Sequence, residues 1–224
     1  MGLINLVLTM AYKGGVNVSD TFGTTAIWES ILYRRLLKNG VIPPVEQISQ
    51  CMYGLVGNPD NQTYDANGSK EAQRTIAGGY VKPPKPGAYD WVVSFDLNSL
   101  YPNIIVQSNI SPETIIRDKT WNHFTQGVNH YLNNDDIQTD DYSVCASGVP
   151  FSKNKQGIIP ELIVEYYAER SVIKQKMLKV KQEYEQTKNT ALESEINQLE
   201  NNQMAIKILL NSLYGAMANK YFKY

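Results

Sequence analysis

Hydrophobic residues in the last third of the chain recur at helical spacing. From residue 160 to residue 189 there is no glycine, and apolar positions three, four or seven apart predict one helix face. They are Leu162, Tyr166, Ile173, Met177 and Val180. After a polar break near Thr187–Thr190, the same spacing returns over residues 191–221. We predict two long helices, each roughly 35–40 Å at 1.5 Å per residue, the first starting at Pro160. A short turn makes them antiparallel.

Upstream of this region, apolar runs alternate with turn signals. A helix is predicted over Thr24–Lys38, with Ile27, Ile31, Leu32 and Arg35 near one face, ending at Asn39-Gly40. The apolar opening, residues 1–12, predicts a core strand or helix, because it lacks a basic leader and is too short to span a bilayer.

Two further segments are defined by turn residues and polarity. Residues 59–75 are polar and predict a surface loop, and residues 118–143 have the character of a variable insertion. Residues 142–160 predict a hairpin, because two short strands flank a polar turn.

A β-strand is predicted from Asp90 to Leu97, after a stretch rich in glycine and proline. Val92, Ser94 and Asp96 would share one face, and Trp91, Val93, Phe95 and Leu97 would share the other. A turn and a helix entered at Pro102 follow, and free N–H groups at a helix start favour an anion. A carboxylate at a strand end is a common Mg²⁺ ligand, although Asp96 could equally serve as a cap or turn residue.

Cationic and polar residues share faces on the two long helices. Arg170 and Lys174 are four apart on the first, and Lys207, Asn211 and Tyr214 are spaced four and three on the second. In an antiparallel pair both faces can line one cleft near the base of the hairpin. Three cations, an amide and a ring suit a triphosphate with a base stacked above it, whereas the alternative is a merely solvated surface.

Composition places few limits on function. The chain has 224 residues, 42% hydrophobic and 19% charged, with a net charge of -1. These values suit a soluble globular protein of one or two domains. The chain lacks the overall basic charge typical of nucleic-acid binding, so any such binding would have to come from local clusters of basic residues. Cys51 and Cys145 lack metal-type spacing and indicate a reduced, cytoplasmic protein. His123 and His130 are expected at the surface. The tryptophans are expected to be packing residues: Trp28, Trp91 and Trp121.

Two motifs resemble those of family B DNA polymerases. The residues 96–105, DLNSLYPNII, resemble the first catalytic motif D-x-x-S-L-Y-P, and residues 207–219, KILLNSLYGAMAN, resemble the fingers motif K-x-x-x-N-S-x-Y-G. Residues 94–115 are especially similar to polymerases of T-even-type bacteriophages. The resemblance runs through nearly the whole chain and is weakest in residues 118–143.

The resemblance implies an α/β (α+β) fold: a partial polymerase palm sheet with a long antiparallel helical-hairpin fingers domain. Its divisions would be residues 1–67, part of the N-terminal domain or linker; 68–156, the first palm segment; 157–219, the fingers; and 220–224, the start of the return to the palm.

The resemblance also implies a role for each residue of the first motif. Asp96 would bind two catalytic Mg²⁺ ions, with the carbonyl of Leu97 as a further ligand. The backbone of Ser99, Leu100 and Tyr101 would hold the β- and γ-phosphates of a dNTP, and the Tyr101 ring would reject a 2′-hydroxyl.

The helices would supply the remaining contacts. Arg170, Lys174 and Lys207 would grip the triphosphate, with Lys207 donating a proton to pyrophosphate and Asn211 in support. Tyr214 and Gly215 would line the nascent pair and its minor groove. Residues Gly78, Gly79 and Tyr80 would contact the template strand. Positioning and charge neutralisation are what phosphoryl transfer needs.

A second carboxylate is missing from this set. Two metals need it close by, and Asp90 would lie about 20 Å from Asp96 along the strand. The family supplies it from a later Y-G-D-T-D-S motif, which does not occur in these 224 residues. We therefore expect a segment of a DNA-directed DNA polymerase, acting on primer–template DNA and dNTP. It would need a second, C-terminal chain with this motif and the thumb, and would reach a sliding clamp through that chain, with no membrane involvement.

Three origins and two rival functions stay open. The chain could be a naturally split subunit, an excised piece or an interrupted reading frame. One rival function is a catalytically inactive dNTP- or DNA-binding fragment or relic. The other is an interaction protein whose hairpin docks partners.

Overall fold

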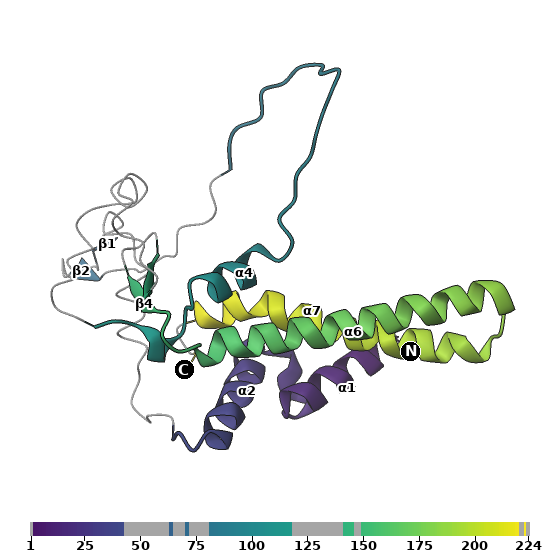
Figure 1. The fold of residues 1–224 in the computed structure, drawn as a ribbon, viewed down its shortest axis with the longest axis horizontal. Helices are drawn as coiled ribbons and strands as arrows, with labels where there is room; N and C mark the ends of the chain where they lie inside the picture. Colours follow the sequence, from purple (N-terminus) through teal and green to yellow (C-terminus); the bar gives the residue numbers. More distant parts are fainter. Residues whose placement is uncertain are drawn as a thin grey trace.

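In the computed structural model, the described residues are 2–42, 63–64, 70–71, 81–117, 141–145, 149–219 and 222. The helices are α1 (Gly2–Gly14), α2 (Thr24–Lys38), α4 (Leu100–Gln107), α6 (Ile158–Thr187) and α7 (Ala191–Met217), with short 3₁₀ turns at Val18–Phe22 and Pro112–Thr114. The strands are β1 (Thr63–Tyr64), β2 (Lys70–Glu71), β3 (Tyr142–Val144) and β4 (Pro150–Ser152). Figure 1 shows α6 and α7 as a long hairpin, with α4 on one side and α1 and α2 on the other.

The helical hairpin confirms the periodicity of the last third of the chain. Its helices have 30 and 27 residues, or about 45 and 40 Å, slightly longer than expected. The prediction that the first helix starts at Pro160 is wrong by one half-turn, because α6 begins at Ile158. Side chains from residues 109–113 accept hydrogen bonds from the N–H groups of its first residues, so the helix starts before the proline.

The far end of the hairpin is held by local contacts. Lys188 adopts a left-handed conformation (φ 52°) that ends α6. Tyr184 donates a hydrogen bond of 2.6 Å to Glu193, and this bond raises the pKa of the phenol. Lys176 pairs with Glu195 at 2.9 Å. Together with a small apolar cluster of Met177, Val180 and Leu199, these contacts set the register of the two helices.

The main core lies at the base of the hairpin, where α7 is surrounded by the other helices. Trp28 of α2 is fully buried there, and its Nε1 donates to the Leu209 carbonyl at 3.1 Å. The predicted α2 helix is confirmed with the same bounds, and its apolar face packs against α7. The core includes Ile27, Ile31, Leu32, Ile159, Leu162, Ile163, Ile206, Leu209 and Leu213. A single core therefore joins the N-terminal helices to the hairpin.

The apolar opening of the chain, predicted as either a core strand or a core helix, forms a helix. Only one edge of α1 is buried, through Met10 and Ala11. Leu3, Ile4 and Tyr12 are exposed, with Tyr12 at 86%. The expectation of a core element thus holds for the end of this helix only.

The predicted strand from Asp90 to Leu97 is not formed. Residues 81–98 have no helix or strand, and Trp91 and Phe95 are 94% and 91% exposed. In Figure 1 the segment loops away from the hairpin before it enters α4. A strand needs a neighbour for its backbone hydrogen bonds, and no described residue pairs with this segment. Trp91 is therefore not a packing residue here, whereas Trp28 is.

The strands make two small antiparallel sheets. The β3–β4 hairpin confirms the prediction for residues 142–160, with Ser143 paired to Phe151. The β1–β2 pair corrects the expected surface loop at residues 59–75, because Thr63 pairs with Glu71. The described residues thus form a mixed fold dominated by helices, with small two-stranded sheets where a palm sheet was expected.

Several predicted residues lie outside the described part of the chain. They are Gly78, Gly79, Tyr80, Cys51, Trp121, His123 and His130. Cys145, at the end of β3, is a free thiol, and burial raises its pKa to about 11. None of the described helices is both long and apolar enough to cross a lipid bilayer.

Candidate functional site

The N-terminus of α4 carries the first motif in an unusual backbone conformation. Ser99, at the N-cap, is left-handed (φ 51°, ψ 50°), and its side chain makes no capping hydrogen bond. Its carbonyl accepts from the Asn103 N–H at 3.1 Å. The helix itself begins at Leu100, two residues before the predicted entry at Pro102. The first N–H groups of α4 thus lack side-chain caps, which leaves them suited to an anion.

Tyr101 and Tyr214 stack on each other. Their ring centroids are 4.7 Å apart and their planes differ by 6°. The two residues are 113 positions apart in the sequence and belong to α4 and α7. Both rings remain partly exposed, at 53% and 41%. The fold therefore brings the two sequence motifs into direct contact.

The outer face of α7 holds the other residues of the second motif. Lys207 and Asn211 are exposed on the same face as Tyr214, while Ala205, Leu209 and Ala216 are buried on the opposite side. Because Tyr214 stacks on α4, this face looks toward α4. Gly215 is also exposed, and an added Cβ would meet no atom within 4 Å. The residues predicted to share one face of this helix, Lys207, Asn211 and Tyr214, are therefore all exposed.

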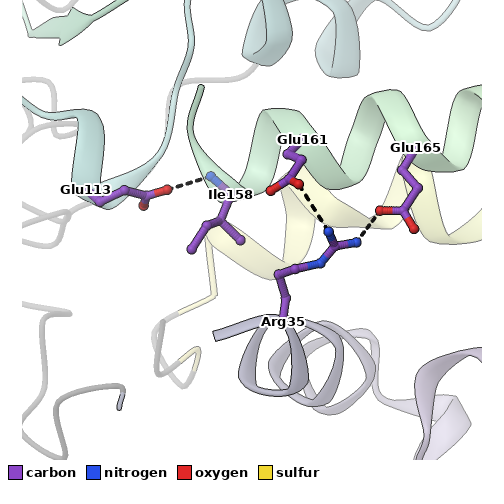
Figure 2. A network of polar contacts seen from close by, with 5 residues as sticks. All are labelled: Arg35, Glu113, Ile158, Glu161 and Glu165. Atoms are coloured by element: carbon purple, nitrogen blue, oxygen red, sulfur yellow. Dashed lines mark hydrogen bonds and ion pairs between the residues drawn. The ribbon is translucent and has the colours of Figure 1, made fainter. Parts of the chain in front are cut away.

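One face of α6 is acidic and is bound by the N-terminal helices. Arg35 of α2 forms ion pairs with Glu161, at 3.2 Å, and with Glu165 (Figure 2). Lys13 of α1 pairs with Glu169 at 2.5 Å. Glu161, Glu165 and Glu169 are four apart, so they form one stripe along the helix. This stripe fixes which side of α6 points toward α1 and α2.

The cations of α6 lie on the side opposite to this acidic stripe. Arg170 and Lys174 each follow a stripe residue, Glu161 or Glu165, by nine positions. Nine residues make about two and a half turns, which reverses the direction of a side chain. These cations thus point away from the acidic stripe that α1 and α2 bind.

The register of the hairpin brings the two cationic faces to the same level. Tyr184 contacts Glu193 across the hairpin. Arg170 precedes Tyr184 by fourteen residues, and Lys207 follows Glu193 by fourteen. Equal lengths of helix therefore separate Arg170 and Lys207 from this contact.

The base of α6 is tied to the segment that follows α4. Asn109 accepts from the Gly157 N–H at 2.9 Å, and Glu113 accepts from the Ile158 N–H at 2.5 Å (Figure 2). Gly157 is packed so tightly that an added Cβ would lie 2.5 Å from the Cβ of Ser111. The position of α6 is therefore coupled to that of α4.

The predicted metal ligands are not gathered into a metal site. Asp96 and Leu97 lie in the irregular segment before α4, and both are exposed. In the described part of the chain, no group of three or more His, Cys, Asp or Glu side chains could hold a metal ion. The structure thus stacks the two tyrosines on each other and leaves Asp96 in solvent.

Comparison with known proteins identifies the family. The model of the family described as DNA polymerase family B matches residues 21–222. This chain belongs to DNA polymerase family B. The match includes both sequence motifs and confirms the resemblance.

The relatives of this family B chain include bacteriophage enzymes. The DNA-directed DNA polymerase of Enterobacteria phage T4 is 27% identical over 265 residues, covering 100% of the chain and 27% of the relative. That of Escherichia phage RB69 is 26% identical, covering 99% of the chain and 26% of the relative. A DNA polymerase of Thermococcus sp. is 37% identical over 62% of the chain. The chain thus spans about a quarter of the length of the phage relatives.

A solved structure shares the fold. The family B DNA polymerase from the archaeon Pyrobaculum calidifontis matches with a TM-score of 0.56 at 20% identity. The match covers 96% of this chain and 22% of that one. The arrangement of helices therefore belongs to a family B polymerase fold.

Sequence reasoning missed two residues that contact or belong to α6, Arg35 and Tyr167. Arg35 was predicted only as part of a helix face. Its ion pairs with Glu161 and Glu165 of α6 join residues more than 120 positions apart, which the pattern within α2 does not reveal. Tyr167 of α6 was overlooked, although its hydroxyl is buried without a hydrogen-bond partner. Its position three residues before Arg170 is the one sequence signal that could have identified it.

Replacing Arg35 with glutamine should destabilise the fold by about 1 kcal/mol, because the guanidinium joins α2 to two carboxylates that are half exposed. Urea unfolding would measure the loss, which should shrink at high salt. Arg34→Gln is the matched control, because the Arg34 guanidinium donates hydrogen bonds to backbone carbonyls of the N-terminal segment, those of Lys13 and Ser30. An equal loss in both variants would contradict a specific bridge to α6.

Proposed function

We propose that this chain supplies the nucleotide-binding part of a DNA-directed DNA polymerase active site. The observation that carries the proposal is the stack of Tyr101 on Tyr214, which joins the two motifs at one place. In this proposal residues 68–156 belong to the palm, residues 157–219 form the fingers, and residues 1–67 and 220–224 connect them to the rest of the enzyme. The family match and the phage relatives, which are DNA-directed DNA polymerases, support it.

The incoming dNTP would lie on the α4 side of the hairpin. Arg170, Lys174 and Lys207 would neutralise the triphosphate, and the free N–H groups at Ser99, Leu100 and Tyr101 would bind phosphate oxygens. Asn211 would hold the triphosphate or the neighbouring lysine in place. A cluster of fixed donors of this kind stabilises the charge that develops in phosphoryl transfer.

The chemistry of the site follows from the same residues. Lys207 would donate a proton to the pyrophosphate as it leaves, since its ammonium group is a proton donor exposed on this face of α7. The Tyr101 ring would pack under the sugar and exclude a 2′-hydroxyl. Tyr214 and Gly215 would line the nascent pair, and Gly78, Gly79 and Tyr80 would contact the template strand.

The donor set fits a magnesium site only in part. Asp96 and the carbonyl of Leu97 offer oxygen ligands, which Mg²⁺ prefers, and Asp96 is exposed enough to accept them. A two-metal site needs a further carboxylate. We propose that it comes from residues outside these 224, on the same polypeptide or on a second chain with the Y-G-D-T-D-S motif and the thumb. When bound, Mg²⁺ would neutralise the phosphates and activate the primer hydroxyl. A sliding clamp would be reached through the same additional part.

A second candidate is a fragment that binds dNTP or DNA without turnover. The observation that favours it is the exposed, unclustered position of Asp96 in the described residues. Primer extension in the presence of the complementing part distinguishes the two candidates.

Lys207→Ala should weaken the binding of Mg·dNTP about 10- to 100-fold, because a charge-assisted contact to phosphate is lost. Fluorescence anisotropy with a labelled dNTP and the 224-residue chain would measure it. Lys179→Ala is the control and should have little effect. Lys179 is exposed and lies five full turns after Glu161, so it points to the acidic side of α6, away from the proposed nucleotide site. Equal losses would indicate a non-specific charge effect. Absence of binding by the folded wild type would contradict a nucleotide site in this chain.

A further inference from the structure

Two buried polar atoms of α6 lack a hydrogen-bond partner. In the described part of the chain, they are the hydroxyl of Tyr167 and the Nε of Arg170. Buried polar groups in proteins nearly always have a partner, so each unpaired one calls for an explanation. Their occurrence in two residues one turn apart indicates a group that binds to both.

The two residues share the face of α6 that is turned away from the N-terminal helices. They are three positions apart, and Lys174 follows Tyr167 by seven, so all three lie along one side of the helix. Arg170 is on the side opposite to Glu161. Tyr167 and Arg170 are partly exposed as whole residues, while the phenol oxygen and the Nε are themselves buried. A phosphate oxygen would therefore reach these two atoms with a shift of the side chains that cover them.

The Tyr167 hydroxyl and the Arg170 Nε–H are chemically suited to bind an anion. An Arg Nε–H can only donate, and a phenol hydroxyl donates readily. A cation would be repelled by the guanidinium, whereas an oxyanion accepts from both groups at once.

We propose that Tyr167 is a phosphate-binding residue, whose hydroxyl and the Nε–H of Arg170 together donate to the phosphate oxygens of the incoming nucleotide. This inference rests on the proposed function and extends it, because Tyr167 lies outside both sequence motifs. It accounts for a buried hydroxyl that has no hydrogen-bond partner within the described residues. A protein can tolerate such an unpaired group where a ligand satisfies it.

Tyr166 provides a matched control on the same helix. Its ring meets Trp28 edge-on at 6.1 Å, on the side of α2, and burial raises the pKa of its phenol to about 12. Phenylalanine at either position keeps the ring and removes only the hydroxyl. The two substitutions therefore compare the same chemical change at neighbouring positions that point about 100° apart around α6.

The test combines stability with binding. Tyr167→Phe should leave the urea midpoint unchanged or raise it, because the lost hydroxyl had no partner in the protein. The same variant should weaken binding of Mg·dNTP and of Mg·tripolyphosphate about tenfold, measured with the 224-residue chain. Tyr166→Phe should leave both affinities unchanged. In the pair Tyr167→Phe and Arg170→Gln, the losses should be non-additive, because both residues bind one group.

Each outcome decides the inference. A lower urea midpoint for Tyr167→Phe would mean that the hydroxyl has a structural partner and would overturn it. Wild-type binding that Tyr167→Phe does not weaken would overturn it while leaving the proposed nucleotide site intact. Binding of tripolyphosphate but not dNTP, weakened by Tyr167→Phe, would support the phosphate contact and contradict the nucleotide site. If the folded wild type binds neither probe, both proposals fail.

Discussion

Primer extension by the completed polymerase should fall about 10³-fold or more when Asp96 is changed to asparagine. A metal ion contributes several kcal/mol of transition-state stabilisation, and each 1.36 kcal/mol changes the rate tenfold. Asparagine keeps the size of the side chain and removes the negative charge that would hold the ion. The assay uses Mg²⁺, dNTPs and primer–template DNA, with this chain alone and with a C-terminal part carrying the Y-G-D-T-D-S motif.

Asp90→Asn is the matched control for this experiment. Asp90 is exposed in the same irregular segment, six residues earlier, and should be replaceable with little effect. Activity only in the mixture, lost with Asp96→Asn, would establish Asp96 as a shared metal ligand. Extension by the chain alone would contradict the need for a further carboxylate. Inactivity of both wild-type arms, with folded proteins, would favour the non-catalytic binding fragment.

The largest effect on stability is expected for Trp28→Ala, at about 3–5 kcal/mol. Trp28 is fully buried between α2 and α7, and its Nε1 bonds to the Leu209 carbonyl and the Ser212 hydroxyl. Its removal would leave a cavity where the N-terminal helices hold the base of the hairpin. Chemical denaturation followed by circular dichroism would measure the loss.

Trp91→Ala provides the control for this change, since Trp91 is 94% exposed. It removes the same side chain and should alter the free energy of unfolding by less than about 0.5 kcal/mol. Similar losses in the two variants would contradict the packing of α2 on α7. A large loss for Trp91→Ala alone would favour the predicted strand over the exposed segment.

Local pattern was sufficient to predict α2, α6 and α7. The spacing of apolar residues in α6 and α7, and the turn residues after α2, act within a few positions of one another. Side chains three or four apart on a helix share a face whatever surrounds them. The sequence by itself therefore determined the hairpin, the exposed cationic faces and the two motifs that identify the family.

Contacts between distant segments could be decided only by the tertiary structure. The stack of Tyr101 on Tyr214 and the bridge from Arg35 to α6 depend on how helices far apart in sequence pack around one core. The segment from Asp90 to Leu97 has the pattern of a strand but stays irregular, because a strand forms only beside a neighbour that accepts its hydrogen bonds. Helical hydrogen bonds are satisfied within the segment itself, whereas those of a strand, and the partners of buried polar side chains, come from elsewhere in the fold.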